Sequence, residues 1–556
     1  MGEKFIIHLF QMKDVFMKEE EYSSKDLDHL GIVSAMCDEI DLVNTIDRLI
    51  PPDPRAVLTT GECIKLMVIN GLGFTSRPLY LEAQFYEGKP IERLLGRQCE
   101  SAEISDDRLG KALDRCYNSG CDALFASIAL KAAIKYNVDR TFRHLDTTSM
   151  EVDGEYVLDD QKIPLVTFGH SKDHRPDLKQ FMISLICSQD GDVPLLAQTI
   201  VGNTSDKTHF RETLLELKSQ IDQETGKHYF VADSALYTAD TLKETSSFAK
   251  WITRVPERIS AASQLIHEYT KNDLKEIADG YFGIEECSIY GGVPQRWLLI
   301  YSEQAFTREK KTLERKIKKE LEIQKKEIRV LASKEFDCEC DARKALSSLE
   351  KKFKYHKIGE IQITQKKVKS GRGRPKKDEQ LTVKYKITSE LGADESKITY
   401  ALEGKGKFII ATNELDEKSL SVEDLLKHYK GQQAVERGFR FLKDPLFMTS
   451  SVFLKKDTRI AALGMVMCLC LLVYTLAQRY LRQKLMELST SVPNQLGKPT
   501  KRPTMRWIFQ IFEGVHVLIH RTLDETKEII LNLNPIRRHI LQILGPSFEK
   551  IYASAA

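Results

Sequence analysis

The chain has 556 residues, of which 42% are hydrophobic and 29% are charged, and its formal net charge is +3. This length exceeds what one compact core accommodates, so we expect two to four domains. The eleven cysteines are odd in number and contain no CxxC pair, which argues against a disulfide framework and a zinc ribbon and favours a reducing cytosol.

The first part of the chain, residues 1–135, has the pattern of helices. Thr59 and Glu62 form a predicted capping box for a helix that runs to about Asn70. Another helix is expected to begin near Ser105, because apolar residues then recur at helical spacing, at Leu109, Leu113, Cys116, Leu124 and Ile128. A small helical DNA-binding domain would have this pattern, but so would any helical bundle.

Between residues 139 and 256 the pattern changes to that of short strands. The runs TFRHLDTT, FMISLICS, PLLAQTIVG, HYFVADSAL and KWITRVP are rich in β-branched or aromatic residues and are bounded by Gly, Pro or Asp. A helical pattern at 209–221 separates the third run from the fourth. This order predicts a mixed α/β sheet whose first three strands form a meander and whose later strands join through helical crossovers.

Residues 257–405 interrupt the α/β pattern. Short strands are expected around FGIEECSIY and RWLLIYS, followed by a charged helical stretch at 306–354 whose apolar residues fall on one side, as in a helical hairpin or short coiled coil. The next segment, 351–377, has eleven Lys or Arg against one Glu and contains Arg372 and Arg374. Its Arg-Gly-Arg-Pro core resembles the AT-hook, so we expect DNA contact there, with a basic linker as the alternative.

The remaining sequence is mainly helical after a strand at GKFIIATN. Residues 461–477 contain no charge, and seventeen residues is the short limit for a membrane span. Only one such segment exists and basic residues flank it on both sides, so we expect a buried core helix and no membrane partner. The first residues, MGEKFIIHLFQMKD, have polar interruptions and no small-residue cleavage site, which is atypical of a signal peptide.

Two aspartates are candidates for chemistry. Asp146 in HLDTTSM and Asp233 in VADSALY each follow an apolar run, so each is expected at the carboxyl end of a strand, where α/β sheets place their ligand sites. Aspartates are also common in turns after strands. The pair alone therefore leaves a purely structural role open.

A helix predicted over 421–443 adds a third acidic residue. Four polar side chains on it, at spacings of three, four and seven residues, lie within roughly 60° of one another: Tyr429, Gln432, Glu436 and Lys443. Val435, Phe439 and Leu442 form an adjacent apolar stripe that would dock the helix onto a sheet. A solvated face with an incidental glutamate is the alternative.

Together, HLDTTS, VADSALY and YKGQQAVERGFRFLK resemble the three acidic motifs of the DDE transposases of bacterial insertion sequences. The resemblance is closest to the branch with a Y-x2-R-x3-E-x6-K signature, which Tyr429, Glu436 and Lys443 match at full spacing. Gln432 occupies the position where the family has Arg. A replacement for that phosphate contact would come from other faces, from Lys430, Arg437 or Arg440.

The resemblance implies an RNase H-like fold. Residues 136–256 and 406–480 would form its two parts, and 257–405 would be an insertion domain. Residues 1–135 would be a helical domain that binds DNA ends, and 481–556 a C-terminal helical region.

The resemblance also implies the chemistry of the site. Asp146, Asp233 and Glu436 would be catalytic residues and the ligands of two Mg²⁺ or Mn²⁺ ions. Hard divalent cations bind oxygen ligands, so carboxylates suffice, and two such ions stabilise the attacking and leaving oxygens of phosphodiester cleavage. Tyr429 and Lys443 would contact phosphate near the scissile bond.

The segment GHSKDHRPDLKQ, residues 169–180, holds two histidines four residues apart, which on a helix is a zinc-ligand spacing. Its glycine and proline disfavour a helix, so zinc is disfavoured too. A loop with Lys172, Arg175 and Lys179 beside the active site is better interpreted as a phosphate contact, with a solvated hairpin as the alternative.

These features predict an insertion-sequence transposase in the cytoplasm of a bacterial or archaeal cell, associated with the nucleoid. It would bind terminal inverted repeats, cut their 3′ ends and join them to target DNA, as a homodimer on two double-stranded DNA ends. One alternative is an RNase H-like nuclease without strand transfer. Another is a catalytically inactive DNA-binding protein derived from a transposase.

Overall fold

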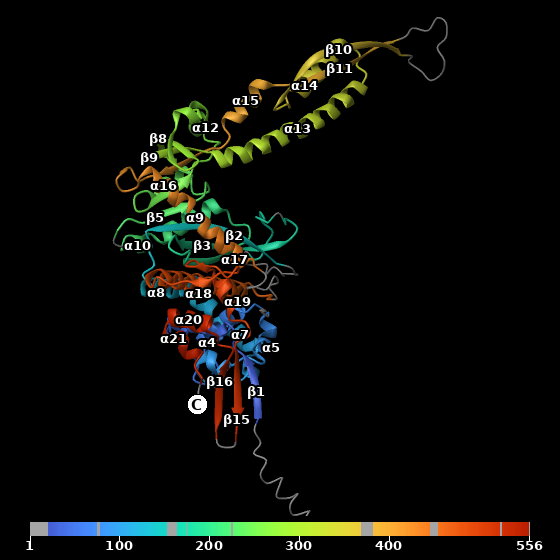
Figure 1. The fold of residues 1–556 in the computed structure, drawn as a ribbon. Helices are drawn as coiled ribbons and strands as arrows, with labels where there is room; N and C mark the ends of the chain where they lie inside the picture. Colours follow the sequence, from blue (N-terminus) through green and yellow to red (C-terminus); the bar gives the residue numbers. More distant parts are fainter. Residues whose placement is uncertain are drawn as a thin grey trace, which may run out of the picture. The chain divides into compact units, whose positions relative to one another are not determined.

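The structure is a computed structural model that describes residues 21–74, 78–152, 164–173, 175–223, 226–368, 382–444, 454–522 and 525–554. The chain divides into two compact units (Figure 1). The first combines residues 1–251 with 427–556, and the second is residues 252–426.

The first unit begins with a strand, β1 (Glu21–Asp26), followed by the predicted helices. These are α2 (Leu30–Glu39), α3 (Leu42–Leu49), α4 (Thr60–Leu72), α5 (Glu82–Tyr86), α6 (Ile91–Leu95), α7 (Asp106–Ser119) and α8 (Cys121–Lys135). The capping box of Thr59 and Glu62 at the start of α4 is confirmed, because each side chain accepts the other residue's backbone N–H. Ser105 caps α7 by accepting the backbone N–H of Arg108.

The predicted mixed sheet is confirmed. Its strands are β2 (Phe142–Val152), β3 (Lys179–Ser188), β4 (Pro194–Val201), β5 (Tyr229–Ala232) and β6 (Lys250–Arg254), in the order β4-β3-β2-β5-β6. Strands β2, β3 and β4 form an antiparallel meander, whereas β5 is parallel to β2. The connections are helical: α9 (Asp206–Glu216) and α10 (Lys218–Ile221) precede β5, and α11 (Ala239–Thr245) precedes β6.

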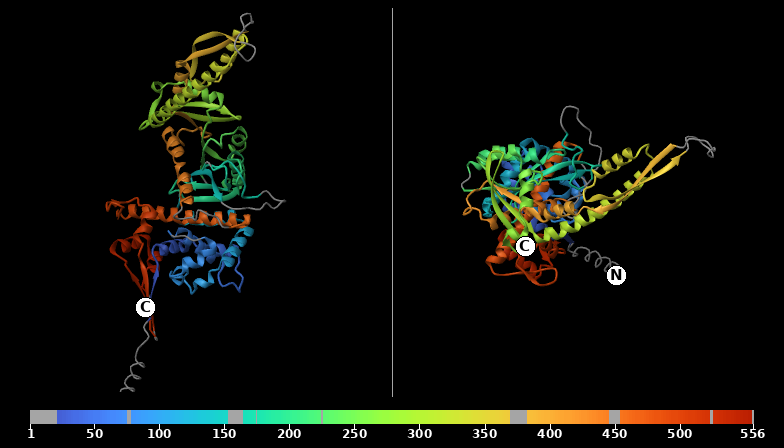
Figure 2. Two further views of the ribbon diagram at one scale, coloured as in Figure 1. Left: turned by 90° about the vertical axis from the view of Figure 1, so that its right-hand side faces the viewer. Right: turned by 90° about the horizontal axis from the view of Figure 1, so that it is seen from above.

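The uncharged segment 461–477 lies in a long helix, α18 (Asp457–Glu487), and its most apolar window is 89% buried. Figure 2 shows α18 running between the sheet and the N-terminal helices, in agreement with its contacts to β4, α4, α7 and α8. It approaches β4 closely at Gly464, where a Cβ would collide with Thr199. The helix therefore has the burial of a core element, as the sequence predicts.

The C-terminal part contains strands that the helical pattern does not predict. β15 (His516–Arg521) and β16 (Thr526–Leu531) form a hairpin that adds to β1 in the order β1-β15-β16. The other elements there are α19 (Met505–Ile511), α20 (Pro535–Leu544), α21 (Pro546–Ile551) and the short strands β13 (Val492–Pro493) and β14 (Pro499–Thr500). The hairpin is difficult to predict because its partner strand lies almost 500 residues away in the chain.

The prediction of a single helix over 421–443 is wrong in one respect. The structure has two helices, α16 (Val422–Lys430) and α17 (Gln433–Leu442), and the boundary between the two units falls inside α16. Between the helices, Gln432 N–H donates to Tyr429 O at 3.1 Å and Ala434 N–H to Gly431 O at 2.8 Å. These three-residue bonds interrupt the four-residue ladder of an α-helix.

The second unit contains the predicted strands and a helical hairpin. Its main sheet has the order β6-β12-β9-β8-β7, with β7 (Lys275–Ala278), β8 (Tyr281–Tyr290), β9 (Val293–Ser302) and β12 (Lys407–Thr412). Its helices are α12 (Ser260–Glu268), α13 (Glu303–Ser333), α14 (Glu339–Glu350) and α15 (Glu395–Glu403).

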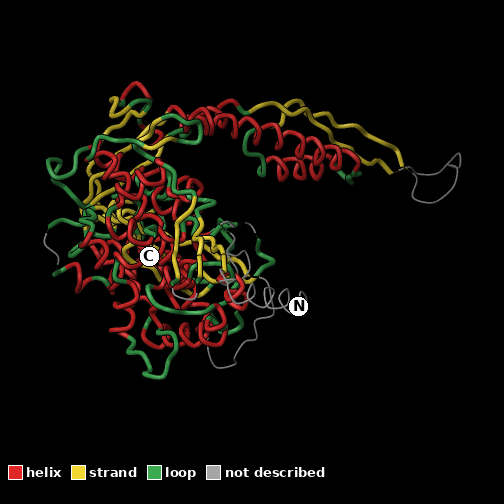
Figure 3. The backbone as a smooth tube through the Cα atoms, turned by 60° about the horizontal axis from the view of Figure 1, so that its bottom comes forward, coloured by secondary structure: helices red, strands yellow, loops and turns green. Residues whose placement is uncertain are grey.

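A two-stranded ribbon of β10 (His356–Val368) and β11 (Thr382–Ala393) completes the second unit. Figure 3 shows α13 and α14 running beside this ribbon, and a small core of Leu331, Ala342, Leu346 and Ile387 joins them. The sequence indicates only a basic segment here. Arg372 and Arg374 of that segment lie outside the described residues.

Candidate active site

Asp146 and Asp233 occupy equivalent positions relative to two neighbouring parallel strands, Asp146 within β2 and Asp233 directly after β5. The register of β2 and β5 pairs Phe142 with Tyr229 and His144 with Val231. Two residues further along each chain segment come Asp146 and Asp233. The expectation that Asp146 ends its strand is wrong, because β2 continues to Val152 paired with β3. The parallel pairing of β2 with β5 ends before Asp146. The two aspartates therefore both lie at the carboxyl end of the paired region.

Local hydrogen bonds hold both carboxylates. Asp146 Oδ1 accepts the backbone N–H of Thr147 at 2.7 Å, and Asp233 Oδ1 accepts that of Ala235 at 2.9 Å. Burial raises the pKa of Asp146 to about 6, and the charges of Asp233 and Asp206 raise it as well, against the lowering effect of Lys172. Burial also raises the pKa of Asp233. Two desolvated carboxylates that repel each other are typical of a site that binds a cation.

Lys172 provides the nearest positive charge. Its Nζ lies 3.6 Å from Asp146 Oδ1 and 3.3 Å from Asp206 Oδ2. It also donates to the carbonyl oxygen of Thr147 at 2.6 Å and to the hydroxyl of Thr147 at 2.9 Å. The ammonium group thus offsets part of the negative charge of the acidic cluster, and the predicted phosphate contact of Lys172 stays a prediction.

Asp206 belongs to the same cluster, although the sequence does not identify it. It is the first residue of α9, and its Oδ1 accepts the hydroxyl of Thr147 at 2.5 Å. Its only signal in the sequence is its place at the start of a helical pattern. Acidic residues are common there because they complement the helix dipole, so this signal does not separate Asp206 from an ordinary first-turn acid.

Glu436 lies on a helix that covers the Asp146 side of the sheet. A Cβ on Gly438 of α17 would lie 3.7 Å from Leu185 Cδ1. Leu185 is the register partner of Asp146 on β3, and paired residues point to the same face of a sheet. Glu436 itself is exposed and makes no hydrogen bond or ion pair with any described residue. The structure thus brings Asp146 and Asp233 together and places Glu436 on a helix that packs against β2 and β3.

The apolar stripe predicted on this helix is confirmed, since Val435, Phe439 and Leu442 are buried. A break at Gly431 separates Tyr429 on α16 from Glu436 on α17, so the shared polar face of these residues stays a prediction. Tyr429 is half-buried and Arg440 is exposed, whereas Gln432 and Lys443 stand at the two ends of α17.

Lys443 forms an ion pair with Asp173, which ties the loop after Lys172 to the end of α17. In the same loop Arg175 pairs with Asp177 at 2.8 Å. Lys179, the first residue of β3, has its Nζ 5.9 Å from the ring centroid of Phe168. The second histidine of the zinc-like spacing, His174, lies outside the described residues.

A cavity of about 690 Å³ beside α17 collects arginines from three segments of the chain: Arg437, Arg440, Arg482, Arg502 and Arg506. Two of them are paired, Arg437 with Asp192 at 2.7 Å and Arg506 with Asp444 at 2.8 Å. Burial lowers the pKa of Arg482, and the charges of Arg502 and Arg437 lower it further. The sequence does not reveal this cluster, because its members are brought together only by folding.

Among the described residues, no group of three or more His, Cys, Asp or Glu side chains is arranged to hold a metal ion. Asp146 and Asp233 nevertheless supply adjacent oxygen donors, which suit a hard divalent cation. The Lys172 ammonium beside them shows that the site accommodates positive charge. The two aspartates therefore fit such an ion, and the participation of Glu436 stays a prediction.

Two family models match the chain. A family model described as a transposase DDE domain matches residues 139–473, and one described as a domain of unknown function (DUF4277) matches residues 22–130. One similar solved structure is the cryo-EM structure of the piggyBac transposase synaptic complex with hairpin DNA. It has 8% sequence identity and a TM-score of 0.35, over 87% of this chain and 79% of that one. No curated protein matches the chain.

Proposed function

The chain belongs to the transposase DDE family, whose model covers more than half of it, and from this premise we propose that it is an insertion-sequence transposase of the Tyr-Arg-Glu-Lys branch. It would cut DNA at the ends of its element and join the freed 3′ ends to target DNA. The core that does this would be RNase H-like, formed by residues 136–256 and 406–480 and interrupted by an insertion.

The observation that carries the proposal is the position of Asp146 and Asp233, each two residues past the last register pair of the adjacent parallel strands β2 and β5, together with the helix α17 that bears Glu436. These three carboxylates would hold two Mg²⁺ or Mn²⁺ ions. When bound, such ions stabilise the charge that develops on the attacking and leaving oxygens. Lys172 would exchange its carboxylate contacts for a phosphate oxygen, and Asp206 would position it through the shared contacts with Thr147.

The arginine-lined cavity supports DNA binding beside this site. Crowded like charges are unfavourable on their own, and a DNA backbone would relieve them while releasing its counterions. Arg440 lines the cavity and would supply the phosphate contact expected of the arginine whose place Gln432 takes. The other proposed DNA contacts are Tyr429, Gln432, Lys443, Lys172, Arg175, Lys179, Arg372 and Arg374.

Coordinated cutting at two element ends implies a homodimer that holds both ends. The reaction takes place on chromosomal DNA, so we place the protein in the cytoplasm, associated with the nucleoid.

The test is a strand-nicking assay on a plasmid that carries the element with both ends. The parent protein should nick the DNA only with Mg²⁺ or Mn²⁺. Asp233→Ala should nick at least about 100-fold more slowly, as expected when a group that stabilises the transition state is lost. Asp222→Ala, an exposed carboxylate elsewhere in the same unit, serves as the matched control. Equal activity of Asp233→Ala and the parent would remove Asp233 from the site.

The products separate the alternatives. Joined molecules with new ends identify a transposase, and nicked DNA without joining identifies a nuclease. A parent protein that binds DNA but never nicks it would be a DNA-binding derivative.

A further inference from the structure

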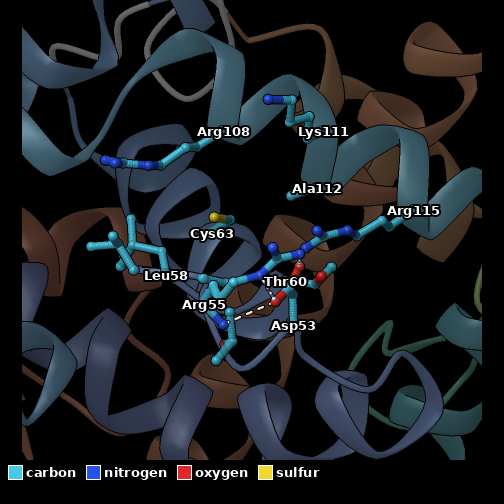
Figure 4. A pocket seen from close by; sticks show the side chains of 12 residues that line it. Asp53, Arg55, Leu58, Thr60, Cys63, Arg108, Lys111, Ala112 and Arg115 are labelled. Carbon is cyan, nitrogen blue, oxygen red and sulfur yellow. Dashed lines mark hydrogen bonds and ion pairs between the residues drawn. The ribbon is translucent and has the colours of Figure 1, made fainter.

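A second basic pocket lies in the N-terminal helical part, within the segment matched by the model of unknown function. It has a volume of about 400 Å³ and is formed by the segment before α4, the first turn of α4 and one face of α7 (Figure 4). It is separate in sequence from the acidic cluster and from the cavity beside α17.

The pocket carries an excess of positive charge. Its lining includes Arg55, Arg108, Lys111 and Arg115 but only one acidic residue, Asp53. Three of the four basic residues come from α7 at spacings of three and four, which places them on one side of that helix. Figure 4 shows Arg55 and Arg115 extending from opposite sides toward Asp53.

The acidic groups near the pocket offset only part of the charge of its four basic side chains. Arg55 Nε lies 3.3 Å from Asp53 Oδ1, and Lys111 pairs with Asp107 at 2.6 Å. Arg108 donates to the carbonyl oxygen of Glu103. Arg115 makes no hydrogen bond or ion pair with any residue that the structure describes, although its charge, after the hydrogen bonds of Arg55, lowers the pKa of Asp53. The donors of the half-buried Arg115 are therefore available to a ligand.

A buried hydroxyl group points to the same conclusion. Thr60 lines the pocket as the first residue of α4, its side chain is 1% exposed, and its Oγ1 has no hydrogen-bond partner among the described residues. Buried polar groups are rarely left unpaired in folded proteins. The start of a thirteen-residue helix also carries a partial positive charge, which favours an anion at this place.

We propose that this pocket binds a backbone phosphate of duplex DNA, with the Arg115 guanidinium and the Thr60 hydroxyl as the groups that meet it. This inference rests on the proposed function, in which DNA is the substrate. A free nucleotide offers the same phosphate chemistry. DNA is favoured because the Arg55 and Lys111 side chains, 91% and 62% exposed, continue the positive charge out of the pocket and suit a row of phosphates.

The experiment compares DNA binding by the full-length parent and by Arg115→Gln over a range of salt concentrations, with EDTA present so that no cleavage occurs. Fluorescence anisotropy of a labelled duplex gives the affinity. Arg115→Gln should weaken binding about 3- to 10-fold and should reduce the slope of log affinity against log salt by about 0.9, the value for one lost phosphate contact. The near-isosteric Thr60→Val should also weaken binding.

Arg48→Gln is the matched control, because Arg48 is an exposed arginine of the same helical region that pairs with Asp41 outside the pocket. It should leave the affinity and the slope unchanged. An Arg115→Gln protein that keeps the parental unfolding temperature, affinity and salt slope would overturn the proposal. Binding of ATP that depends on Arg115, with unchanged DNA binding, would also overturn it and would make the pocket a nucleotide site.

Failure of the pocket and failure of the proposed function give different results. Asp233→Ala should lose nicking activity and keep the parental salt slope of DNA binding. Arg115→Gln should have a smaller salt slope and should nick DNA at the parental rate when DNA is saturating. A parent protein that binds DNA through Arg115 but never nicks it would contradict the proposed function and support the pocket.

Discussion

At the residue scale, the acidic cluster contains a carboxylate, Asp146, whose negative charge is disfavoured in the folded protein. The nearby ammonium group of Lys172 offsets part of this cost. Asp146 is partly buried near Asp233 and Asp206, and Lys172 and the backbone N–H of Thr147 oppose the resulting rise in its pKa. A site of this kind reduces the stability of the protein without a cation and gains from binding one.

The first prediction concerns Asp146→Asn. Folding raises the pKa of Asp146 from 3.8 to about 6, so its neutral form is favoured in the folded protein. The contribution of this raised pKa to the free energy of unfolding is fully present below about pH 4 and is lost as the pH rises through 6. Without divalent ions at pH 8, Asp146→Asn should therefore increase the free energy of unfolding by up to about 3 kcal/mol, at 1.36 kcal/mol per pKa unit.

Denaturant unfolding at pH 8 and near pH 4 measures this effect, which should disappear at the lower pH. Added Mn²⁺ should stabilise the parent but not the variant. A variant that is destabilised equally at both pH values would contradict the burial of a charged Asp146.

The second prediction concerns Lys172→Gln. The charge of Lys172 lowers the pKa of Asp146, so its removal should raise that pKa and move the acid limb of the pH–rate profile for nicking to higher pH. Lys243→Gln, an exposed lysine on α11, is the control and should keep the parental profile. An unshifted profile would contradict the effect of Lys172 on the pKa of Asp146.

At the element scale, the site depends on how closely α17 approaches the sheet. Gly431, at the break before α17, lies so close to β2 and its neighbours that a Cβ would come within 3.0 Å of both His144 Cε1 and Gln189 Cδ. His428 Nδ1, three residues earlier, donates to Gln189 Oε1 at 2.7 Å. The break therefore allows α16 and α17 to follow the sheet rather than to continue as one straight helix.

The third prediction follows from this contact. Gly431→Ala should destabilise the protein by about 1–3 kcal/mol through overpacking and should slow nicking, because α17 and Glu436 must shift. Gly392→Ala is the matched control, since no heavy atom lies within 4 Å of a Cβ there. Denaturant unfolding and the nicking assay check both variants, and a Gly431→Ala protein with parental rate and stability would contradict this packing.

Local patterns in the sequence predict the elements whose causes are local. The Thr59 capping box, the β-branched runs of β2–β6 and the charged helical hairpin are all present. The break at Gly431 is not predicted, because a single glycine inside a helical pattern is often tolerated and its contact with His144 is visible only after folding. The β15–β16 hairpin, the place of Asp206 beside Thr147 and the arginine cavity are not predicted either, because each is formed by segments that are distant in the sequence.

At the scale of the whole molecule, the acidic cluster and both basic pockets lie in the first unit, while the strongest local run of positive charge in the sequence belongs to the second. DNA binding and chemistry should therefore be separable by mutation. The fourth prediction is that Arg372→Ala combined with Arg374→Ala weakens DNA binding and lowers the salt slope by up to about 1.8. Nicking at saturating DNA should be retained, and an unchanged affinity would remove this segment from the DNA interface.

The central claim is that Asp146, Asp233 and Glu436 share one metal site, and iron-directed cleavage tests it most directly. Fe²⁺ takes the place of Mg²⁺, and ascorbate with peroxide then cuts the protein backbone close to the bound ion. The account predicts cuts near Asp146 in β2, near Asp233 after β5 and near Glu436 in α17, all suppressed by excess Mg²⁺ and absent in Asp233→Ala. Cuts at the two strands without one in α17, or cuts that Mg²⁺ does not suppress, would contradict the shared site.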